Sequence, residues 1–190
     1  MTSAEVRPGA VVGRALDLLR RHAGPVYALS LAVTLVNTVP DVARQLLVYD
    51  DPGRGSALLV DVVGFATGLL AQLWLTGALT GLPGDGRVRP RGALGRGVAT
   101  AVRAVRTSPA AVLAGVVLGG AVSALVTVPA SVAALGVDGV LGPLGAPSAA
   151  AFTVATVSDV VASWLTLPFL AVVLVLTAGS TGRSAGRSGP

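Results

Sequence analysis

The sequence predicts an all-α integral membrane protein, with four transmembrane helices in two helix-hairpin repeats, each preceded by a basic amphipathic interfacial helix. Only 12% of the 190 residues are charged and the mean hydropathy is +0.78, whereas about 25% of residues are charged in an average soluble domain. Uncharged runs of 18, 23, 31 and 23 residues occupy 23–40, 62–84, 107–137 and 160–182. Each is near or beyond the length of about 20 residues that crosses a bilayer.

The first half begins with a short helix that is polar on one side. Apolar residues recur at helical spacing from Val11 to Ala23, and arginines occupy the other side, which favours a helix lying at the membrane interface. Pro25 suits the first turn of the first crossing, which reaches Pro40 or continues to Leu47. The second crossing is expected from Ala57 to Leu82.

The second half repeats this order, with an amphipathic helix, a crossing that opens at Pro109, a Gly/Pro-rich connection over 136–148 and a crossing from about Ala150 to Ala178. Three pairs of matching features, at offsets of 84, 89 and 90 residues, indicate an internal duplication: Pro25 and Pro109, Thr38-Val39-Pro40 and Thr127-Val128-Pro129, and Trp74-Leu75-Thr76 and Trp164-Leu165-Thr166. The expected segments are an N-terminal arm (1–9), a first repeat (10–82), a basic cytoplasmic loop (83–93), a second repeat (94–178) and a disordered tail (179–190).

The distribution of arginine predicts the orientation of the chain. With four crossings, 12 of the 14 arginines fall on one side of the membrane, and Arg44 and Arg54 fall on the other. Because basic loops are retained in the cytoplasm, both termini are expected there. A three-crossing alternative, with the first apolar run buried or re-entrant, would place the N-terminal arginines outside. Arginine without lysine, together with abundant Ala, Gly and Val, is typical of a GC-rich bacterial genome, so we expect a multipass protein of the bacterial plasma membrane.

The composition excludes several chemistries. The chain has no cysteine and no lysine, and His22 is its single histidine, so a disulfide, a cysteine-ligated metal, a Walker A loop and an HExxH zinc site are all excluded. Aromatic residues make up 4% of the chain and no nucleic-acid recognition motif is present, which argues against nucleic-acid binding despite the basic pI. We therefore expect no catalytic residue, no cofactor and no metal.

The segment GRALDLLRRHAGP, residues 13–25, followed by a helical hairpin, resembles repeats in uncharacterised bacterial multipass proteins related to the membrane domain of glycerophosphoryl diester phosphodiesterases. The resemblance covers residues 10–178 and implies a multipass helical fold. In those enzymes catalysis resides in a separate soluble domain, so no catalytic residue is carried over to this chain. The family commonly has more than four crossings.

Two groups of residues are candidates for a site. Arginines on the two amphipathic helices are expected to contact anionic lipid head groups or a partner. Alternatively, the same arginines serve only to set the membrane topology. These residues are Arg14, Arg20, Arg21, Arg96, Arg103 and Arg106. Asp159 lies inside the fourth crossing, where a carboxylate needs a partner or a proton, and Asn37 and Gln72 could approach it from other helices. Asp159 would then be either a protonatable transport site or a structural acid at a helix interface.

The sequence thus favours a non-enzymatic accessory or scaffold protein that contacts the anionic bilayer surface, with a small transporter or permease component as the alternative. A homo-oligomer or a membrane-protein partner is compatible with both hypotheses. Two further features bear on packing. Pro168 should bend the fourth crossing by freeing the Trp164 carbonyl, and small-xxx-small spacing at Gly115 and Gly119, and at Gly64 and Gly68, could bring helices into close contact.

Overall fold

The computed structural model describes residues 7–50, 54–141 and 148–180, and within these ranges it contains helices and no strand. The prediction of an all-helical chain is therefore confirmed for this part of the protein. The elements are α1 (Pro8–Arg21), α2 (Ala23–Asp50), α3 (Arg54–Ala78), the 3₁₀ turn η1 (Leu79–Gly81), α4 (Leu82–Asp85), α5 (Ala93–Thr107), α6 (Pro109–Leu141) and α7 (Ala149–Gly179).

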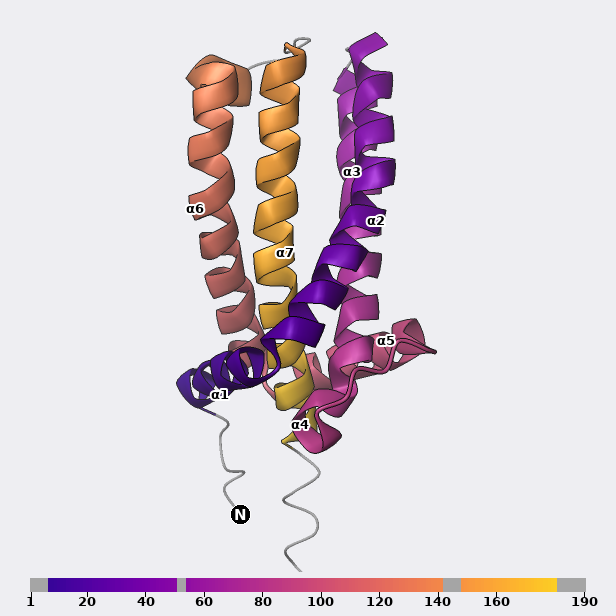
Figure 1. Cartoon of the computed structure of the whole chain (residues 1–190), viewed down its shortest axis with the longest axis vertical. Coiled ribbons are helices and arrows are strands. Elements are labelled where there is room, and N and C mark those ends of the chain that lie inside the picture. The colour runs from indigo at the N-terminus through magenta and orange to yellow at the C-terminus, as the bar shows by residue number, and fades with distance from the viewer. Residues whose placement is uncertain (1–6, 51–53, 142–147, 181–190) are drawn as a thin grey trace, which may run out of the picture.

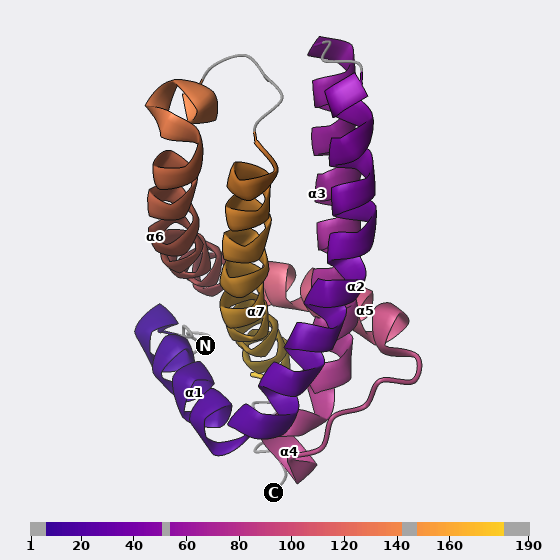
Figure 2. The same cartoon turned by 45° about the horizontal axis from the view of Figure 1, so that its top comes forward.

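Four helices are long and apolar enough to cross a membrane, as the sequence predicts. The candidate spans are Ala23–Pro40, Val62–Asp85, Pro109–Ala134 and Ala149–Gly179. The long helices stand side by side, and α7 lies between α6 and the α2–α3 pair and packs against all three (Figure 1). The short helices α1 and α5 lie across the same end of the bundle, where α7 also ends (Figures 1 and 2). The fold is that of a multipass membrane protein.

A single residue joins each short helix to the long helix that follows it. His22 separates α1 from α2; its N–H donates to the Leu18 carbonyl at 3.0 Å, and its own carbonyl accepts from the Val26 N–H at 3.2 Å. Ser108 separates α5 from α6 and makes the same two bonds, to residues four before and four after it, at 3.0 and 3.2 Å. At these two elbows the chain turns while the joining residue pairs its N–H with the helix before it and its carbonyl with the helix after it.

Proline does not end the long helices. The sequence leaves open whether the first crossing stops at Pro40 or continues, and α2 runs through Pro40 to Asp50. In α6 the backbone leaves the helical conformation at Gly136, with φ 74° and ψ 164°, before helix resumes as far as Leu141. Glycine adopts this positive φ without steric cost. The break falls at the residue where the sequence predicts that the connection begins.

The parts predicted as loops and tails are only partly described. Residues 1–6 of the N-terminal arm and residues 181–190 of the predicted disordered tail lie outside the described residues, as do 51–53 and 142–147 in the two hairpin connections. The predicted basic loop 83–93 contains part of the short helix α4, followed by a turn.

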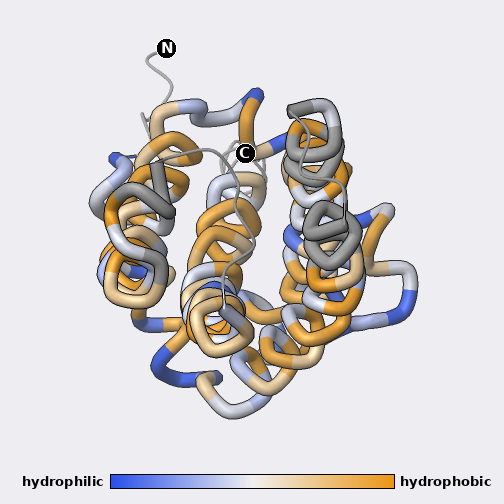
Figure 3. Tube along the Cα trace, turned by 90° about the horizontal axis from the view of Figure 1, so that it is seen from above, coloured by the Kyte–Doolittle hydropathy of each residue, from blue (hydrophilic) through white to orange (hydrophobic). Residues whose placement is uncertain are grey.

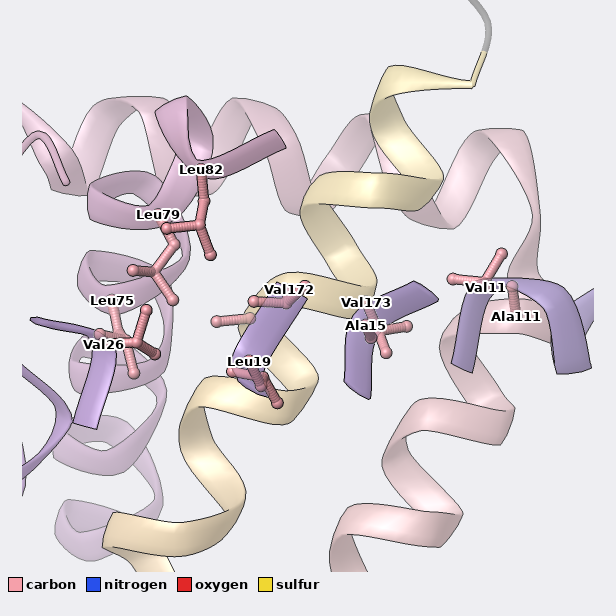
Figure 4. Close-up of a cluster of buried hydrophobic side chains, with 11 residues drawn as sticks. Val11, Ala15, Leu19, Val26, Leu75, Leu79, Leu82, Ala111, Val172 and Val173 are labelled. Atoms are coloured by element: carbon pink, nitrogen blue, oxygen red, sulfur yellow. The ribbon is translucent and has the colours of Figure 1, made fainter. Parts of the chain in front are cut away.

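The hydrophobic core is concentrated at the end of the bundle that carries α1 and α5. One cluster joins Val11, Ala15 and Leu19 of α1 to Leu75 and Leu79 of α3 and η1, and to residues of α2, α6 and α7 (Figure 4). Away from this end the long helices expose large apolar side chains; Val36, Phe65 and Leu125 are each more than 70% exposed. Hydrophobic residues predominate along the long helices in the view along the bundle (Figure 3). Lipid covers such a surface in a membrane-spanning bundle.

Candidate functional site

The helix α1 uses its apolar face to dock on the bundle and exposes its arginines. Val11, Ala15 and Leu19 recur every four residues, are buried, and face α7 and α6. Leu16 lies beside this face and is 44% exposed. The three candidate arginines of α1 are all exposed on the remaining surface; they are Arg14, Arg20 and Arg21.

The helix α5 docks through small residues instead of large apolar ones. Its buried residues are Ala93, Gly97 and Ala104, and they pack against α3 and α7. A Cβ added to Gly97 would overlap the carbonyl oxygen of Leu73, and one added to Gly77 of α3 would overlap the carbonyl oxygen of Ala93. The two helix backbones are therefore in direct contact where they cross, and only glycine allows this approach.

Arg96 has a structural role that separates it from the other candidate arginines. Its guanidinium donates to the carbonyl of Gly77 at 3.3 Å, to that of Arg91 at 2.7 Å, and to that of Arg89. These carbonyls lie near the C-terminal end of α3 and in the turn that follows, where the helix dipole favours a positive charge. Arg96 thus clamps the turn between α4 and α5, whereas Arg103 and Arg106 are exposed.

The same turn is fixed by backbone and side-chain contacts. The Arg89 N–H donates to the Ala78 carbonyl at 2.7 Å, and the Arg89 guanidinium pairs with Asp85 at 2.6 Å. Gly86 adopts a positive φ of 68°, and its Cα lies against the imidazole ring of His22, which a Cβ would meet at 2.9 Å. The single histidine of the chain thus lies in the first elbow and packs on this turn.

A buried polar contact joins α2 to α7 at the proline of α7. Pro168 has no N–H to offer the Trp164 carbonyl, as the sequence predicts. The Ser30 hydroxyl donates to this carbonyl at 2.9 Å, and the indole Nε1–H of Trp164 donates to the Tyr27 carbonyl at 2.8 Å. The Tyr27 and Trp164 rings also meet edge to face, with their centroids 6.1 Å apart. A side chain of a neighbouring helix therefore satisfies the carbonyl that Pro168 leaves free.

The hydrogen bonds of Gln72 are made at a distance from Asp159. Its amide Nε2 donates to the Thr76 hydroxyl at 3.3 Å and to the Leu167 carbonyl at 3.4 Å. Leu167 follows Asp159 by eight residues of α7, which is about 12 Å along the helix axis at 1.5 Å per residue. Gln72 is therefore placed to bind the backbone next to Pro168, two helical turns from the carboxylate.

Asp159 itself is exposed in the part of α7 that lies away from the core, and Asn37 of α2 is half-buried. Ser158, the residue before it, is buried and donates to the Ala155 carbonyl at 2.8 Å. On α2, Thr34 is buried, and its hydroxyl has no hydrogen-bond partner among the described residues. Of the three residues proposed from the sequence as an intramembrane polar site, Gln72 is thus separated from Asp159 along α7.

Glycines predicted at helix contacts have different surroundings. Gly115 of α6 faces α7, where an added Cβ would meet Val173 at 2.9 Å, and one on Gly119 would meet Phe169 at 4.0 Å. This pair therefore serves packing within the chain. Gly68 has open space around it. The contact between Gly77 and Gly97 is not among those predicted from the sequence, although the four-residue spacing of Ala93 and Gly97 is the same small-xxx-small signal.

Among the described residues, no group of three or more His, Asp or Glu side chains is placed to hold a metal ion. Comparison of the chain with protein-family models, with curated proteins and with solved structures finds no match. The resemblance to the membrane domain of glycerophosphoryl diester phosphodiesterases therefore stays a prediction from the sequence.

Proposed function

We propose that this chain is a non-enzymatic accessory or scaffold protein of the bacterial plasma membrane, and that the arginines of α1 and α5 contact anionic lipid head groups on the cytoplasmic side. One observation carries the proposal: two arginine-bearing helices lie across the same end of a four-span bundle and expose their guanidinium groups. The exposed arginines are Arg14, Arg20, Arg21, Arg103 and Arg106.

The placement of charge supports this orientation. The first described residues and the end of α7 lie at the end of the bundle that carries these arginines (Figure 1), while Arg44 and Arg54 belong to the far end of α2 and the start of α3. Anionic lipid attracts each exposed basic residue by about 1 kcal/mol at low salt. Five such residues give a selectivity large enough to measure, and it should weaken as the salt concentration rises.

The test measures the preference of the protein for anionic lipid. Purified protein is reconstituted with brominated phosphatidylglycerol or brominated phosphatidylcholine, and quenching of the fluorescence of Trp74 and Trp164 reports how much of each lipid lies against the helices. The native protein should favour phosphatidylglycerol. Replacing the five exposed arginines by glutamine should remove this preference, while Arg44→Gln with Arg54→Gln should preserve it. Equal quenching by both lipids in the native protein would refute the proposal.

A second test concerns orientation. A reporter that is active only in the periplasm, fused after Pro190, should remain inactive. Activity of this fusion would place the arginine-bearing end outside and contradict the proposed cytoplasmic contact. The alternative function, a small transporter that uses Asp159, has weaker support because Gln72 is bound to the backbone of α7 two turns away.

A further inference from the structure

The surface of α5 has three distinct sides. The side formed by Ala93, Gly97 and Ala104 is buried against the bundle. A second side carries an aliphatic stripe that is largely exposed: Leu94 (41%), Val98 (44%), Val102 (46%) and Val105 (51%). At about 100° per residue the centre of this stripe lies about 115° around the helix from the buried side. The third side carries the arginines.

The contacts of Arg96 show which way the stripe faces. Its guanidinium binds carbonyls of Arg89 and Arg91, in the turn beyond the end of α3. Arg96 lies about 165° around α5 from the centre of the stripe at about 100° per residue. Because the Arg96 side faces the turn beyond the membrane-spanning helix, the stripe faces back toward the membrane-spanning part of the bundle.

We propose that the aliphatic stripe of α5 (Leu94, Val98, Val102 and Val105) is inserted into the acyl-chain region of the leaflet at this end of the bundle, so that α5 is an interfacial anchor with Arg103 and Arg106 at the level of the head groups. The proposal rests on the proposed position of this end at the bilayer surface. Exposed aliphatic side chains gain free energy when lipid covers them, and arginines on the remaining side of the helix complement anionic head groups. A second copy of the chain is a poorer occupant, because four half-exposed side chains fall far short of the about 800 Å² that each partner buries in a stable interface.

The contrast with α1 sharpens the inference. There the apolar face is occupied by the bundle, and Leu16 is the exposed large apolar residue of the helix. In α5 the glycine and alanine side makes the intramolecular contact, and the large side chains are left outside it. The structure therefore assigns membrane insertion to α5 and simple docking to α1.

The absence of cysteine from the sequence permits a direct test. Single-cysteine variants Val98→Cys and Val105→Cys on the stripe, with Ala99→Cys as the matched control on the exposed arginine side, are labelled with a nitroxide. The full-length protein is reconstituted in vesicles of neutral phosphatidylcholine. Collision rates of each label with oxygen, which concentrates in acyl chains, and with a water-soluble nickel chelate are then measured.

The labels at positions 98 and 105 should favour oxygen over nickel more strongly than the label at 99, by roughly tenfold, as expected for side chains about 5–10 Å below the head-group boundary. Equal ratios at the three positions would mean that the stripe lies no deeper in the bilayer than the arginine side, and would overturn the inference. Protection of positions 98 and 105 from both reagents would also overturn it, because protein would then cover the stripe. Neutral lipid is used so that failure here is distinct from a failure of the proposed selectivity for anionic lipid.

Discussion

The backbone contact between α3 and α5 leads to a sharp prediction for Gly97→Ala. The new methyl group would overlap the carbonyl oxygen of Leu73, and a backbone atom cannot swing aside as a flexible side chain can. Overpacking of this kind costs about 1–3 kcal/mol or more. Alanine is also favoured over glycine inside a helix by about 0.8–1.0 kcal/mol, so part of the steric cost will be hidden in the measured stability.

Gly95→Ala is the matched control that removes this compensation. Gly95 lies in the same helix, and a Cβ added there meets nothing within 4 Å. The Gly95→Ala variant should therefore gain the stability that alanine adds to a helix, without the steric clash. The difference in free energy of unfolding between Gly97→Ala and Gly95→Ala then isolates the steric cost, which we expect to be about 1–3 kcal/mol or more.

The assay is unfolding in mixed micelles of increasing sodium dodecyl sulfate content, followed by circular dichroism and by tryptophan fluorescence, to which Trp74 near the crossing contributes. Gly97→Ala should unfold at a lower dodecyl sulfate fraction than Gly95→Ala. A double variant with Gly77→Ala should lose less than the sum of the two single losses, because either methyl group alone already separates the helices. Unfolding of Gly97→Ala and Gly95→Ala at the same detergent fraction would refute the backbone contact.

Three further outcomes are expected. Ser30→Ala should destabilise the bundle by about 1 kcal/mol. Adding Pro168→Ala should recover part of this loss, because the alanine N–H can bond the Trp164 carbonyl. A double-mutant cycle in which the two substitutions show no coupling would contradict the proposed role of Ser30. Arg96→Gln should speed tryptic cleavage in the turn 86–92 several-fold, whereas neutralising an exposed arginine of the same helix should leave the rate there unchanged. Asp159→Asn should insert and unfold like the native protein, since asparagine retains hydrogen-bonding capacity; a loss of folded protein would show that the ionised carboxylate is required.

The sequence was a good guide to the long helices because length and hydropathy determine them. The uncharged runs correspond to the four candidate spans, and Pro109 opens α6 as expected. The sequence leaves the end of the first crossing open at Pro40, and α2 runs through this residue, since a lost N–H in a long apolar helix still leaves the rest of the helix hydrogen-bonded. Hydropathy periodicity cannot distinguish a helix that ends at the proline from one that continues through it. It reports the polarity of side chains and not the backbone hydrogen bonds that remain around the proline.

The docking side of α5 could not be read from hydropathy. Leu94, Val98 and Val102 recur at helical spacing on one apolar face of α5, and a packing side would ordinarily be sought there. The structure buries glycine and alanine instead, because the closeness of two helix backbones depends on side-chain size as well as on polarity. The role of Arg96 was hidden for a related reason, since its carbonyl partners are brought together only by the turn after α3.

The duplication hypothesis stays a prediction from the sequence, since the two halves share local features but not a symmetric core. The elbows at His22 and Ser108 make the same pair of backbone hydrogen bonds, and each short helix packs on the last long helix of the other half, α1 on α7 and α5 on α3. A twofold axis along the membrane normal would produce this exchange. The Trp-Leu-Thr motifs differ, however, since Leu75 is fully buried and Leu165 is 37% exposed. The departure from symmetry extends to the docking sides of α1 and α5, and α5 is the helix whose large apolar residues remain available to the bilayer.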